Sequence, residues 1–528
     1  MCELCILTQN FDPARHTHNL PWGTPTSDDT EVVVPPTGTL DELADYLTDG
    51  FWEDVGGTGR SFALSPGENT DYVVSVNLTE LTNVGQRLAR WALETWETVA
   101  DIQFVEVQFG GDIQVDDEFD GAFAQTTTDR TGTEITEVFV NVDKTWISDF
   151  GSTLDSFTFS TYVHEFGHAL GLGHLGNYNG SSGAVTFAND SYQQSVMSYI
   201  PQDQVDATNA SFAEPTGPMM ADILAIQSLY GASTITAGDT VWGQGGTYSR
   251  HFTTLFAGID DEDDSTQEAG PIAFALFDDA NDDGVDLIDL RPSTTDDVLN
   301  LRAETFSDVG GLTGNVAIAR GSAFENARMG SGSDIVIGNT LDNMLWGHRG
   351  ADDLYGARGN DTLFGGRGND ELFGGGGSDN LFGAQGRDEL FGGGGSDNLF
   401  GARGNDDLFG GRGRDTLRGD KGDDYLDSGA GNDVMTGGEG LDQFFYGFGH
   451  DRDRITDFSL GEDELLFSAI DFENYNAERF VETYAVEQAN GVAFEFGQSV
   501  SQGADYNDRL VLVGVFDLDA LVDDIVFI

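Results

Sequence analysis

The 528-residue sequence predicts an α+β domain followed by an all-β parallel β-roll with a β-rich C-terminal cap. Two observations support this prediction. Helix-like and strand-like patterns are mixed between residues 41 and 231, and a nine-residue repeat with a fixed aspartate runs through residues 329–445. The expected order is a leader at 1–40, the mixed domain at 41–231, a connecting β region at 232–328, the repeats at 329–445 and a cap at 446–528.

The composition is strongly acidic. Asp and Glu number 92 and Lys and Arg number 24, which gives a formal net charge of −68. This charge disfavours nucleic acids and anionic membranes as partners and favours cations. A surface adapted to salt would also explain the total, but it would not place aspartates at fixed intervals.

The N-terminal residues and the cysteines bear on the cellular setting. Cys2 and Cys5 are the only cysteines, so no disulfide framework holds the domains, and stability must come from the cores and from metals. Residues 1–20 lack the basic and apolar regions of a cleavable secretory signal, and no stretch is apolar enough for stable membrane insertion. Residues 1–40 have few periodic apolar residues, which is typical of a leader or propeptide.

The mixed domain shows patterns of helices that cover a sheet. Helices are expected at residues 88–99, 159–170 and 218–230. The first has the candidate cap Asn83, the second has Ser156 or Ser160 with Gly171 as its end, and the third ends at Gly231. Strand patterns occur at residues 104–109, 112–115 and 138–142.

The string HEFGHALGLGH occupies residues 164–174, in the second expected helix and the turn after it. Histidines four residues apart project from one helix face, so His164 and His168 can reach one ion. Gly171 lets the chain turn back and bring His174 to the same ion. Three neutral imidazoles suit Zn²⁺ and leave a coordination position for water, which is typical of a catalytic zinc site.

Three further residues fit this zinc site. Glu165 follows the first histidine and is a candidate general base for the water. Met197 and Tyr199, each taken alone, would be ordinary buried packing residues. Met197 follows His174 by 23 residues, which matches a methionine turn beneath the metal, and the phenol of Tyr199 could then face the zinc.

The repeat is exemplified by GGRGNDELF at residues 365–373. Its glycines permit tight turns, its carboxylates and turn carbonyls are the hard oxygen ligands that Ca²⁺ prefers, and its leucine points into a stacked core. A disordered Gly/Asp tract is the alternative, but an apolar residue two positions after every fixed residue argues against it. The fixed position holds Asn343 and otherwise Asp334, Asp352, Asp361, Asp370, Asp379, Asp388, Asp397, Asp406, Asp415, Asp424, Asp433 and Asp442.

These motifs resemble those of the serralysins, repeat-containing members of the metzincin zinc peptidases. The resemblance extends from about residue 40 and includes HEFGHALGLGH, GNYNG, SVMSY, PMMADILAIQSLYG, FSDVGGLTGNVAIARG and the nonapeptides. It implies a metzincin catalytic fold, zinc on the three motif histidines, Glu165 as general base, and Tyr199 as a resting zinc ligand that stabilises the transition state. One departure is Leu175, where many members have proline, which bears on loop stiffness and not on metal binding.

The resemblance also implies where calcium binds. In rolls of this type two turns on the same side share an ion, so aspartates two repeats apart, such as Asp361 and Asp379, should act together. Because stacked carboxylates repel one another, we expect the roll to fold only with calcium. The expected ligands are Asp334, Asp352, Asp361, Asp370, Asp379, Asp388, Asp397, Asp406, Asp415, Asp424 and Asp433, with Gly356, Gly359, Gly365, Gly368, Gly374, Gly377, Gly392 and Gly395, and upstream Asp278, Asp283 and Glu325.

Residues 523–528 combine acids with apolar residues, similar to the uncleaved export signal of type I secreted serralysins, and they also suit a final strand that caps the roll. With no N-terminal signal, they predict export through a type I channel and a secreted, extracellular monomer. The expected partners are protein or peptide substrates, the type I secretion machinery and a proteinaceous inhibitor. A strand at residues 112–115 bordering the cleft would bind a substrate peptide through its main chain.

Two functions are compatible with these features. One is a secreted zinc endopeptidase, and the other is a calcium-stabilised surface or adhesion module whose peptidase domain is vestigial. The intact set of ligands together with Glu165 favours the endopeptidase. In the leader, Cys2 or Cys5 could ligate the zinc of a zymogen, although a role in N-terminal processing or no role at the site fits them better.

Overall fold

The computed structural model describes residues 35–63, 72–178, 185–244, 246, 271–279, 284–447, 449–468, 475–496 and 508–528. Within it the chain forms two compact units, one of residues up to 286 with 303–323, and one of residues 287–302 with 324–528. Most of the expected leader, with Cys2 and Cys5, lies outside the described residues. The domain boundaries expected from the sequence stay predictions.

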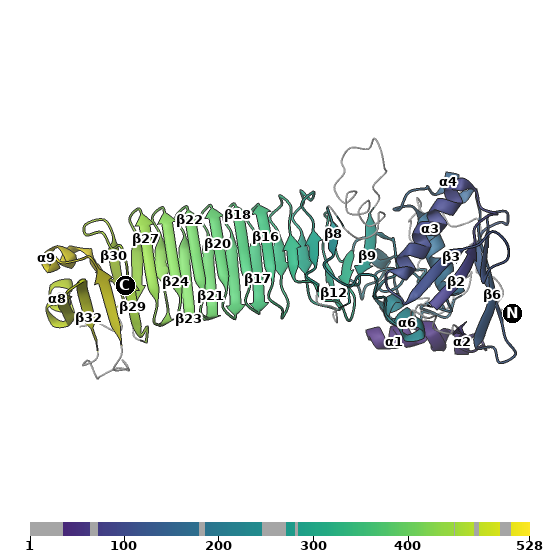
Figure 1. Ribbon diagram of the computed structural model, residues 1–528, viewed down its shortest axis with the longest axis horizontal. Helices are drawn as coiled ribbons and strands as arrows, with labels where there is room; N and C mark the ends of the chain where they lie inside the picture. Colours follow the sequence, from purple (N-terminus) through teal and green to yellow (C-terminus); the bar gives the residue numbers. More distant parts are fainter. Residues whose placement is uncertain are drawn as a thin grey trace, which may run out of the picture. The chain divides into compact units, whose positions relative to one another are not determined.

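The first unit combines a mixed sheet with helices, as predicted (Figure 1). Its helices are α1 (Leu40–Asp45), a π-helical turn (Tyr46–Gly50), α2 (Phe51–Asp54), α3 (Asn83–Glu97), α4 (Trp146–Asp149), α5 (Phe157–Ala169) and α6 (Met220–Tyr230), with a 3₁₀ turn at Gln202–Gln204. The main sheet contains β1 (Ser61–Phe62), β2 (Tyr72–Asn77), β3 (Ile102–Glu106), β4 (Ile113–Asp116), β5 (Ala122–Thr128) and β6 (Glu134–Val142). The unit also holds β7 (Glu214–Pro215), β8 (Val241–Gly243), β9 (Ile272–Leu276), β12 (Thr305–Ser307) and β13 (Val316–Ile318).

The strand order of the main sheet corrects one expectation. β4, at the predicted strand 112–115, is paired on one side with β2 and on the other with β6. Its main-chain groups are therefore used by its neighbours, and it does not border a cleft. β5 instead runs antiparallel along the other edge of β6. Among the described strands, only β6 pairs with β5, so β5 is an edge strand of the sheet.

The predicted helices form with small shifts at their starts. α3 is capped by Thr82, whose hydroxyl accepts the N–H of Gly85 at 3.2 Å, so Asn83 lies inside the helix. α5 is capped by Ser156, the first of the two predicted candidates. α6 begins at Met220, two residues after Pro218, and ends at Tyr230 with Gly231 as its C-cap, as expected.

In the second unit, parallel strands alternate between two sheets and confirm the predicted β-roll. One sheet runs β10-β14-β16-β18-β20-β22-β24-β27-β29, and the other runs β11-β15-β17-β19-β21-β23-β25-β28-β30. Their bounds are β10 (Leu287–Asp289), β11 (Val298–Asn300), β14 (Asn326–Arg328), β15 (Ile335–Ile337), β16 (Met344–Arg349), β17 (Asp353–Arg358), β18 (Thr362–Arg367), β19 (Glu371–Gly376), β20 (Asn380–Gln385), β21 (Glu389–Gly395), β22 (Asn398–Arg403), β23 (Asp407–Gly413), β24 (Thr416–Lys421), β25 (Tyr425–Asp427), β26 (Ala430–Gly431), β27 (Val434–Glu439), β28 (Gln443–Tyr446), β29 (Arg452–Ile455) and β30 (Glu464–Phe467).

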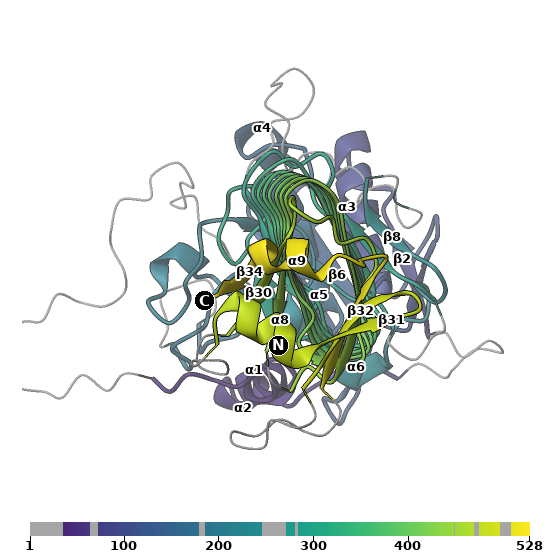
Figure 2. The same ribbon diagram turned by 90° about the vertical axis from the view of Figure 1, so that its left-hand side faces the viewer.

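Each coil of the roll contains two nonapeptides. Leu363 of β18 therefore lies beside Leu381 of β20, which lies beside Leu399 of β22. Figure 2 looks along the roll and shows the strands of successive coils lying over one another. The apolar residue of every repeat, from Val336 to Phe444, is 0–1% exposed, so these side chains form the predicted interior spine.

Aromatic rings stack on the outer faces of the roll. Trp346, Phe364, Phe382 and Phe400 follow one sheet with ring centroids 4.9–5.7 Å apart. Tyr355, Phe373, Phe391 and Phe409 follow the other at 4.8–4.9 Å. The outer surface of the roll is thus stabilised by the same repeat as its interior.

A cap closes the C-terminal end of the roll, as predicted. It contains α8 (Ala477–Tyr484), β31 (Ala485–Gln488), β32 (Gly491–Glu495), β33 (Arg509–Val513), α9 (Leu518–Leu521) and β34 (Ile525–Phe527). Phe467, Phe480 and Phe494 form an aromatic core between its elements. β34, at the extreme C-terminus, adds to β30 as a final parallel strand. Across the described part of the chain, no helix has the length and apolar character needed to cross a bilayer.

Candidate zinc and calcium sites

Helix α5 brings the predicted zinc ligands to one point. His164 and His168 lie one turn apart on it, and the helix ends at Ala169. Gly171 then adopts φ +111°, where a Cβ would overlap the carbonyl oxygen of Arg60, so glycine is required at this turn. The turn returns His174, and one ligand atom from each of the three imidazoles lies within 4.8 Å of the others.

The hydrogen bonds of the imidazoles leave their Nε2 atoms directed at this point. Nδ1 of His164 lies 2.8 Å from the carbonyl oxygen of Val196, and Nδ1 of His168 lies 2.8 Å from that of Leu172. Nδ1 donates in each case, so the lone pair of each of these two imidazoles lies on Nε2. Nε2 of His168 lies 3.0 Å from Nε2 of His174. Such an approach of nitrogens fits a shared cation.

Burial keeps these imidazoles neutral. It lowers the pKa of His164 to about 4 and that of His168 to about 3, and it lowers the pKa of His174 well below its ordinary value, with the neighbouring histidines adding to the last two shifts. Neutral imidazole is the form that binds a metal. The donor set and its burial therefore fit Zn²⁺.

Glu165 lies beside the histidines with its carboxylate fully buried. Neither carboxylate oxygen has a hydrogen-bond partner among the described residues. Burial raises its pKa well above the ordinary value, and a cation on the histidines would oppose that shift. An unpartnered buried carboxylate next to a metal site is suited to proton transfer.

Met197 and Tyr199 both lie next to the histidine cluster. Met197 is fully buried under α5, so close that a Cβ on Gly167 would lie 2.5 Å from its sulfur. The ring of Tyr199 lies 5.6 Å from that of His164 and 4.5 Å from that of His174, centroid to centroid. The structure thus gathers the expected zinc-site residues in one place.

The N-terminal helices support the third histidine, which the sequence did not predict. Phe51 meets His174 edge to face, with ring centroids 5.2 Å apart. The indole N–H of Trp52 donates to the carbonyl oxygen of Gly171 at 2.9 Å, and the N–H of Gly173 donates to that of Leu47 at 2.7 Å. Short helices of this kind carry little periodic signal, so residues 40–54 gave no helix pattern to recognise.

Two buried carboxylates near the methionine turn were also missed. Asp222 accepts the hydroxyl of Ser195 at 2.5 Å and the N–H of Val196 at 2.7 Å. Asp190 accepts the hydroxyls of Tyr178 and Ser198. Burial raises the pKa of Asp222 to about 7 and that of Asp190 to about 6. Asp222 lies in PMMADILAIQSLYG, but no local pattern distinguishes it from a surface acid.

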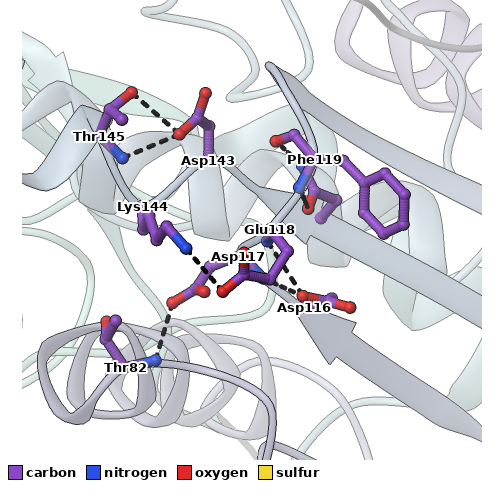
Figure 3. A network of polar contacts seen from close by, with 9 residues as sticks. Thr82, Asp116, Asp117, Glu118, Phe119, Asp143, Lys144 and Thr145 are labelled. Atoms are coloured by element: carbon purple, nitrogen blue, oxygen red, sulfur yellow. Dashed lines mark hydrogen bonds and ion pairs between the residues drawn. The ribbon is translucent and has the colours of Figure 1, made fainter.

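The loop between β4 and β5 fixes the start of the edge strand (Figure 3). Asp117 accepts the N–H of Thr82, the cap of α3, at 2.7 Å. The ammonium of Lys144 pairs with Glu118 at 2.6 Å, and Asn141 bonds the backbone of Phe119 through both atoms of its amide. The loop that leads into β5 is therefore fixed to α3 through Asp117 and to β6 through Phe119.

The predicted calcium aspartates form two rows along the roll. In each row an aspartate accepts, through Oδ1, the N–H of the residue 18 positions earlier, as Asp379 does from Asp361 at 2.8 Å. The other oxygen, Oδ2, is buried and has no hydrogen-bond partner among the described residues in Asp334, Asp352, Asp361, Asp370, Asp379, Asp388, Asp397, Asp406, Asp415, Asp424, Asp433 and Asp442. Burial raises the pKa of Asp361 to about 7 and that of Asp379 to about 6. Rows of unpartnered carboxylate oxygens fit Ca²⁺.

The predicted glycines line these rows. Gly356, Gly365, Gly374 and Gly392 lie where a Cβ would overlap Oδ2 of the aspartate five residues later. Gly359, Gly368, Gly377 and Gly395 adopt φ between +119° and +154°. The first set of glycines thus leaves the space that the carboxylates occupy, and the second set supplies the positive φ of the turns.

The remaining expected calcium residues differ from the rows. The main-chain carbonyl oxygen of Glu325 accepts the side-chain amide N–H of Asn343 at 2.9 Å. Asp278 is buried and accepts the hydroxyl of Thr240 and the indole N–H of Trp242. Asp283 lies outside the described residues.

The hydrogen-bonded rows extend beyond the visible repeat. Asp334 accepts the N–H of Asp297, 37 residues earlier, at 2.9 Å. At the other end, Asp453 accepts the N–H of Asp433 at 3.0 Å and Asp463 accepts that of Asp442 at 3.1 Å. These acids were not predicted because insertions break the period. Only the constant aspartate two residues before a buried apolar side chain could have revealed them.

Comparisons with known proteins match both parts of the chain to families of metallopeptidases. A family model described as Matrixin matches residues 68–212, and one described as Peptidase M10 serralysin C terminal matches residues 232–507. Metalloprotease AprA of Pseudomonas entomophila is 33% identical over 335 residues, covering 59% of this chain and 66% of that protein. Metallopeptidase AprA of Pseudomonas marginalis is 33% identical over 337 residues, covering 59% and 67%.

A third relative, the serralysin of Photorhabdus luminescens, is 34% identical over 270 residues, covering 49% of this chain and 53% of that protein. The chain thus spans about two thirds of the first two relatives and about half of the third. The Matrixin match includes α5 with His164 and His168, and the serralysin C-terminal match covers more than half of the chain. The chain therefore belongs to the serralysin family of metallopeptidases.

Proposed function

We propose that the chain is a secreted zinc-dependent endopeptidase that hydrolyses peptide bonds of extracellular proteins. The observation that carries this proposal is the convergence of three neutral imidazoles beside the unpartnered carboxylate of Glu165. Relatives named metalloprotease and serralysin support the same class of enzyme.

The roles of the residues follow from their positions. A bound zinc ion would polarise the scissile carbonyl and acidify a water molecule. His164, His168 and His174 would hold the ion as neutral ligands. Glu165 would take the proton of the attacking water on its carboxylate and deliver it to the leaving nitrogen. Tyr199 would ligate zinc at rest and donate its phenol hydrogen to the developing oxyanion.

The substrate would bind along β5. This strand is the antiparallel edge of the main sheet, and α5, which carries the zinc ligands, packs against it. An extended peptide would pair with its outer edge through main-chain hydrogen bonds. Because such bonds do not depend on side chains, the enzyme would accept many sequences.

Calcium would fold and stabilise the roll. The ions would be held by the free Oδ2 atoms of the aspartate rows and by turn carbonyls, including those of Gly356 and Gly359. The upstream residues Asp278, Asp283 and Glu325 would add further ligands. In a cell poor in calcium the roll would stay unfolded, which suits export of a monomer through a type I channel, and a proteinaceous inhibitor is a candidate partner of the folded enzyme.

The test is casein hydrolysis by the calcium-loaded protein and by its Glu165→Gln variant, with zinc content measured in both. The variant should keep its zinc and lose activity by about 10²- to 10⁴-fold, because it lacks the general base. Glu137→Gln, an exposed glutamate on β6, is the matched control. Full zinc occupancy without hydrolysis in the unaltered protein would refute the proposal and favour an adhesion module.

A further inference from the structure

One buried carboxylate holds the segment that carries Tyr199. Asp190 is 1% exposed. Its two oxygens accept the hydroxyl of Tyr178 at 2.9 and 3.0 Å, and Oδ1 also accepts the hydroxyl of Ser198 at 2.6 Å. Asp190 contributes no atom to the histidine cluster, so the mechanism above leaves this network without a role.

The hydroxyls of Tyr178 and Ser198 also hydrogen-bond to the backbone around Tyr199. The hydroxyl oxygen of Tyr178 accepts the N–H of Tyr199 at 3.3 Å, and that of Ser198 accepts the N–H of Ile200 at 3.1 Å. Both peptide units that flank the Tyr199 side chain are thereby tied to Asp190. A backbone held in this way cannot shift without breaking buried hydrogen bonds, which is costly.

Tyr178 also flanks the ring of Tyr199. The two rings are stacked, with centroids 4.9 Å apart and planes 25° apart. The ring of Tyr178 is in turn 5.5 Å from that of His174. At Gly176 a Cβ would lie 2.7 Å from Oδ2 of Asp190 and closer still to the ring of Tyr178, so glycine leaves the space this pair occupies.

The other half of the methionine turn has a separate anchor. Asp222 binds Ser195 and the N–H of Val196, whereas Asp190 binds the segment from Ser198 to Ile200. The segment that carries Tyr199 is therefore fixed independently of the segment that backs His164. Two anchors would be redundant if the only need were to hold Met197 in the core.

We propose that Asp190 and Tyr178 are positioning residues for Tyr199. They fix its backbone and one side of its ring, so that the phenol approaches and leaves the metal by rotation of the side chain alone. The inference rests on the proposed function, in which Tyr199 is a zinc ligand at rest. It predicts that loss of either residue changes how often the phenol lies on the metal, without removing a metal ligand.

The test uses the full-length, calcium-loaded protein with Cu²⁺ in place of zinc, because imidazole sites bind Cu²⁺ well and a coordinated phenolate gives a visible charge-transfer band. Tyr199→Phe should abolish this band. Tyr178→Phe and Asp190→Asn should weaken or shift it. In the zinc enzyme the same two variants should lower kcat by about 10- to 100-fold, as other partners of metal ligands do, with a much smaller change in KM.

Tyr230→Phe is the matched control for loss of a buried hydroxyl. The hydroxyl of Tyr230 donates to the carbonyl oxygen of Leu170 at 2.7 Å and accepts the N–H of Phe62 at 3.1 Å, and neither partner belongs to the segment from Ser198 to Ile200. This variant should lower Tm and leave the copper band that depends on Tyr199 unchanged. The same melting experiment on Tyr178→Phe shows whether that variant is folded at the assay temperature.

An unchanged band and kcat in Tyr178→Phe and Asp190→Asn would overturn the proposal, as would an equal change of the copper band in Tyr230→Phe. Absence of any band that depends on Tyr199 in the unaltered protein would also overturn it, because there would be no ligand to position. In that case hydrolysis that still depends on Glu165 would leave the peptidase proposal standing.

Discussion

Replacing Gly167 by alanine should damage the zinc site even though alanine favours a helix. Gly167 lies in α5 just before the second histidine. A Cβ there would lie 2.5 Å from the sulfur of Met197 and 3.1 Å from Cζ2 of Trp96. Both side chains are 0% exposed, so they have no free space into which to move.

Opposing contributions set the size of the effect. Alanine gains about 1 kcal/mol in helix propensity over glycine. Forcing a methyl group into a packed core costs about 1–3 kcal/mol. The net loss is then about 0–2 kcal/mol, and its middle value of about 1 kcal/mol lowers Tm by about 2–4 °C in a domain of this size.

The same change should weaken zinc binding. Met197 follows Val196, whose carbonyl oxygen lies 2.8 Å from Nδ1 of His164. Movement of Met197 disturbs this contact, and loss of such a contact reduces metal affinity by about 10- to 100-fold. Melting of the calcium-loaded protein and zinc titration against a chelator measure the two effects.

Gly217→Ala is the control for this substitution. A Cβ at Gly217 would lie 3.7 Å from the nearest atom of Thr95, at ordinary contact distance. The variant should therefore be neutral or up to about 1 kcal/mol more stable. If Gly167→Ala also raised Tm and kept its zinc affinity, close packing of α5 on the methionine turn would not be the reason for glycine.

In the roll, Leu381→Ala should cost about 2–5 kcal/mol because it empties a buried position, whereas Phe382→Ala on the outer stack should cost less, about 1–3 kcal/mol for its two ring pairs. Calcium titrations followed by circular dichroism compare them, and equal shifts in the calcium midpoint would contradict the inward spine. With calcium chelated, the roll should keep its strand signal in acid and lose it as the pH rises through about 6–7. Burial raises the pKa of carboxyls such as Asp370 to about 7, so their protonated forms stabilise the fold fully below the ordinary carboxyl pKa, and this stabilisation is lost above the raised one. Strand signal at pH 8 without calcium would refute this reasoning. Trp52→Phe should weaken zinc binding by about 1 kcal/mol, since it removes the hydrogen bond to the turn at Gly171. Competition with a chelator measures the zinc affinity, and an unchanged affinity would contradict this role of Trp52.

The features that the sequence predicted best are local or periodic. The helix α5 was recognisable because the spacing of His164 and His168 matches one helical turn and because Gly171 follows as a helix-ending residue. The roll was recognisable because one aspartate and one leucine return every nine residues. In both cases the residues that act together are close in sequence or related by a fixed step.

The features that it did not predict depend on contacts between distant segments. The sequence of a single strand does not determine its neighbours in the sheet. β4 was therefore expected to border the substrate cleft, but it lies inside the sheet and β5 lies at the edge. Asp190 and Asp222 are isolated acids in the sequence, and only the fold shows that they are buried against the methionine turn. Their importance arises from desolvation, which local patterns do not reveal.

The periodic sequence of the roll does not by itself determine which coil pairs with which. Residues 374–382 and 392–400 have the same sequence, GGGGSDNLF, so a chain that paired these coils one place out of order would bury nearly the same side chains. The aperiodic ends can prevent this error. Asn343 bonds to Glu325 at one end, and at the other the spacing of the aspartates changes from 18 residues to 20 between Asp433 and Asp453. These two irregular coils act as reference marks, so that each identical coil between them has only one correct place.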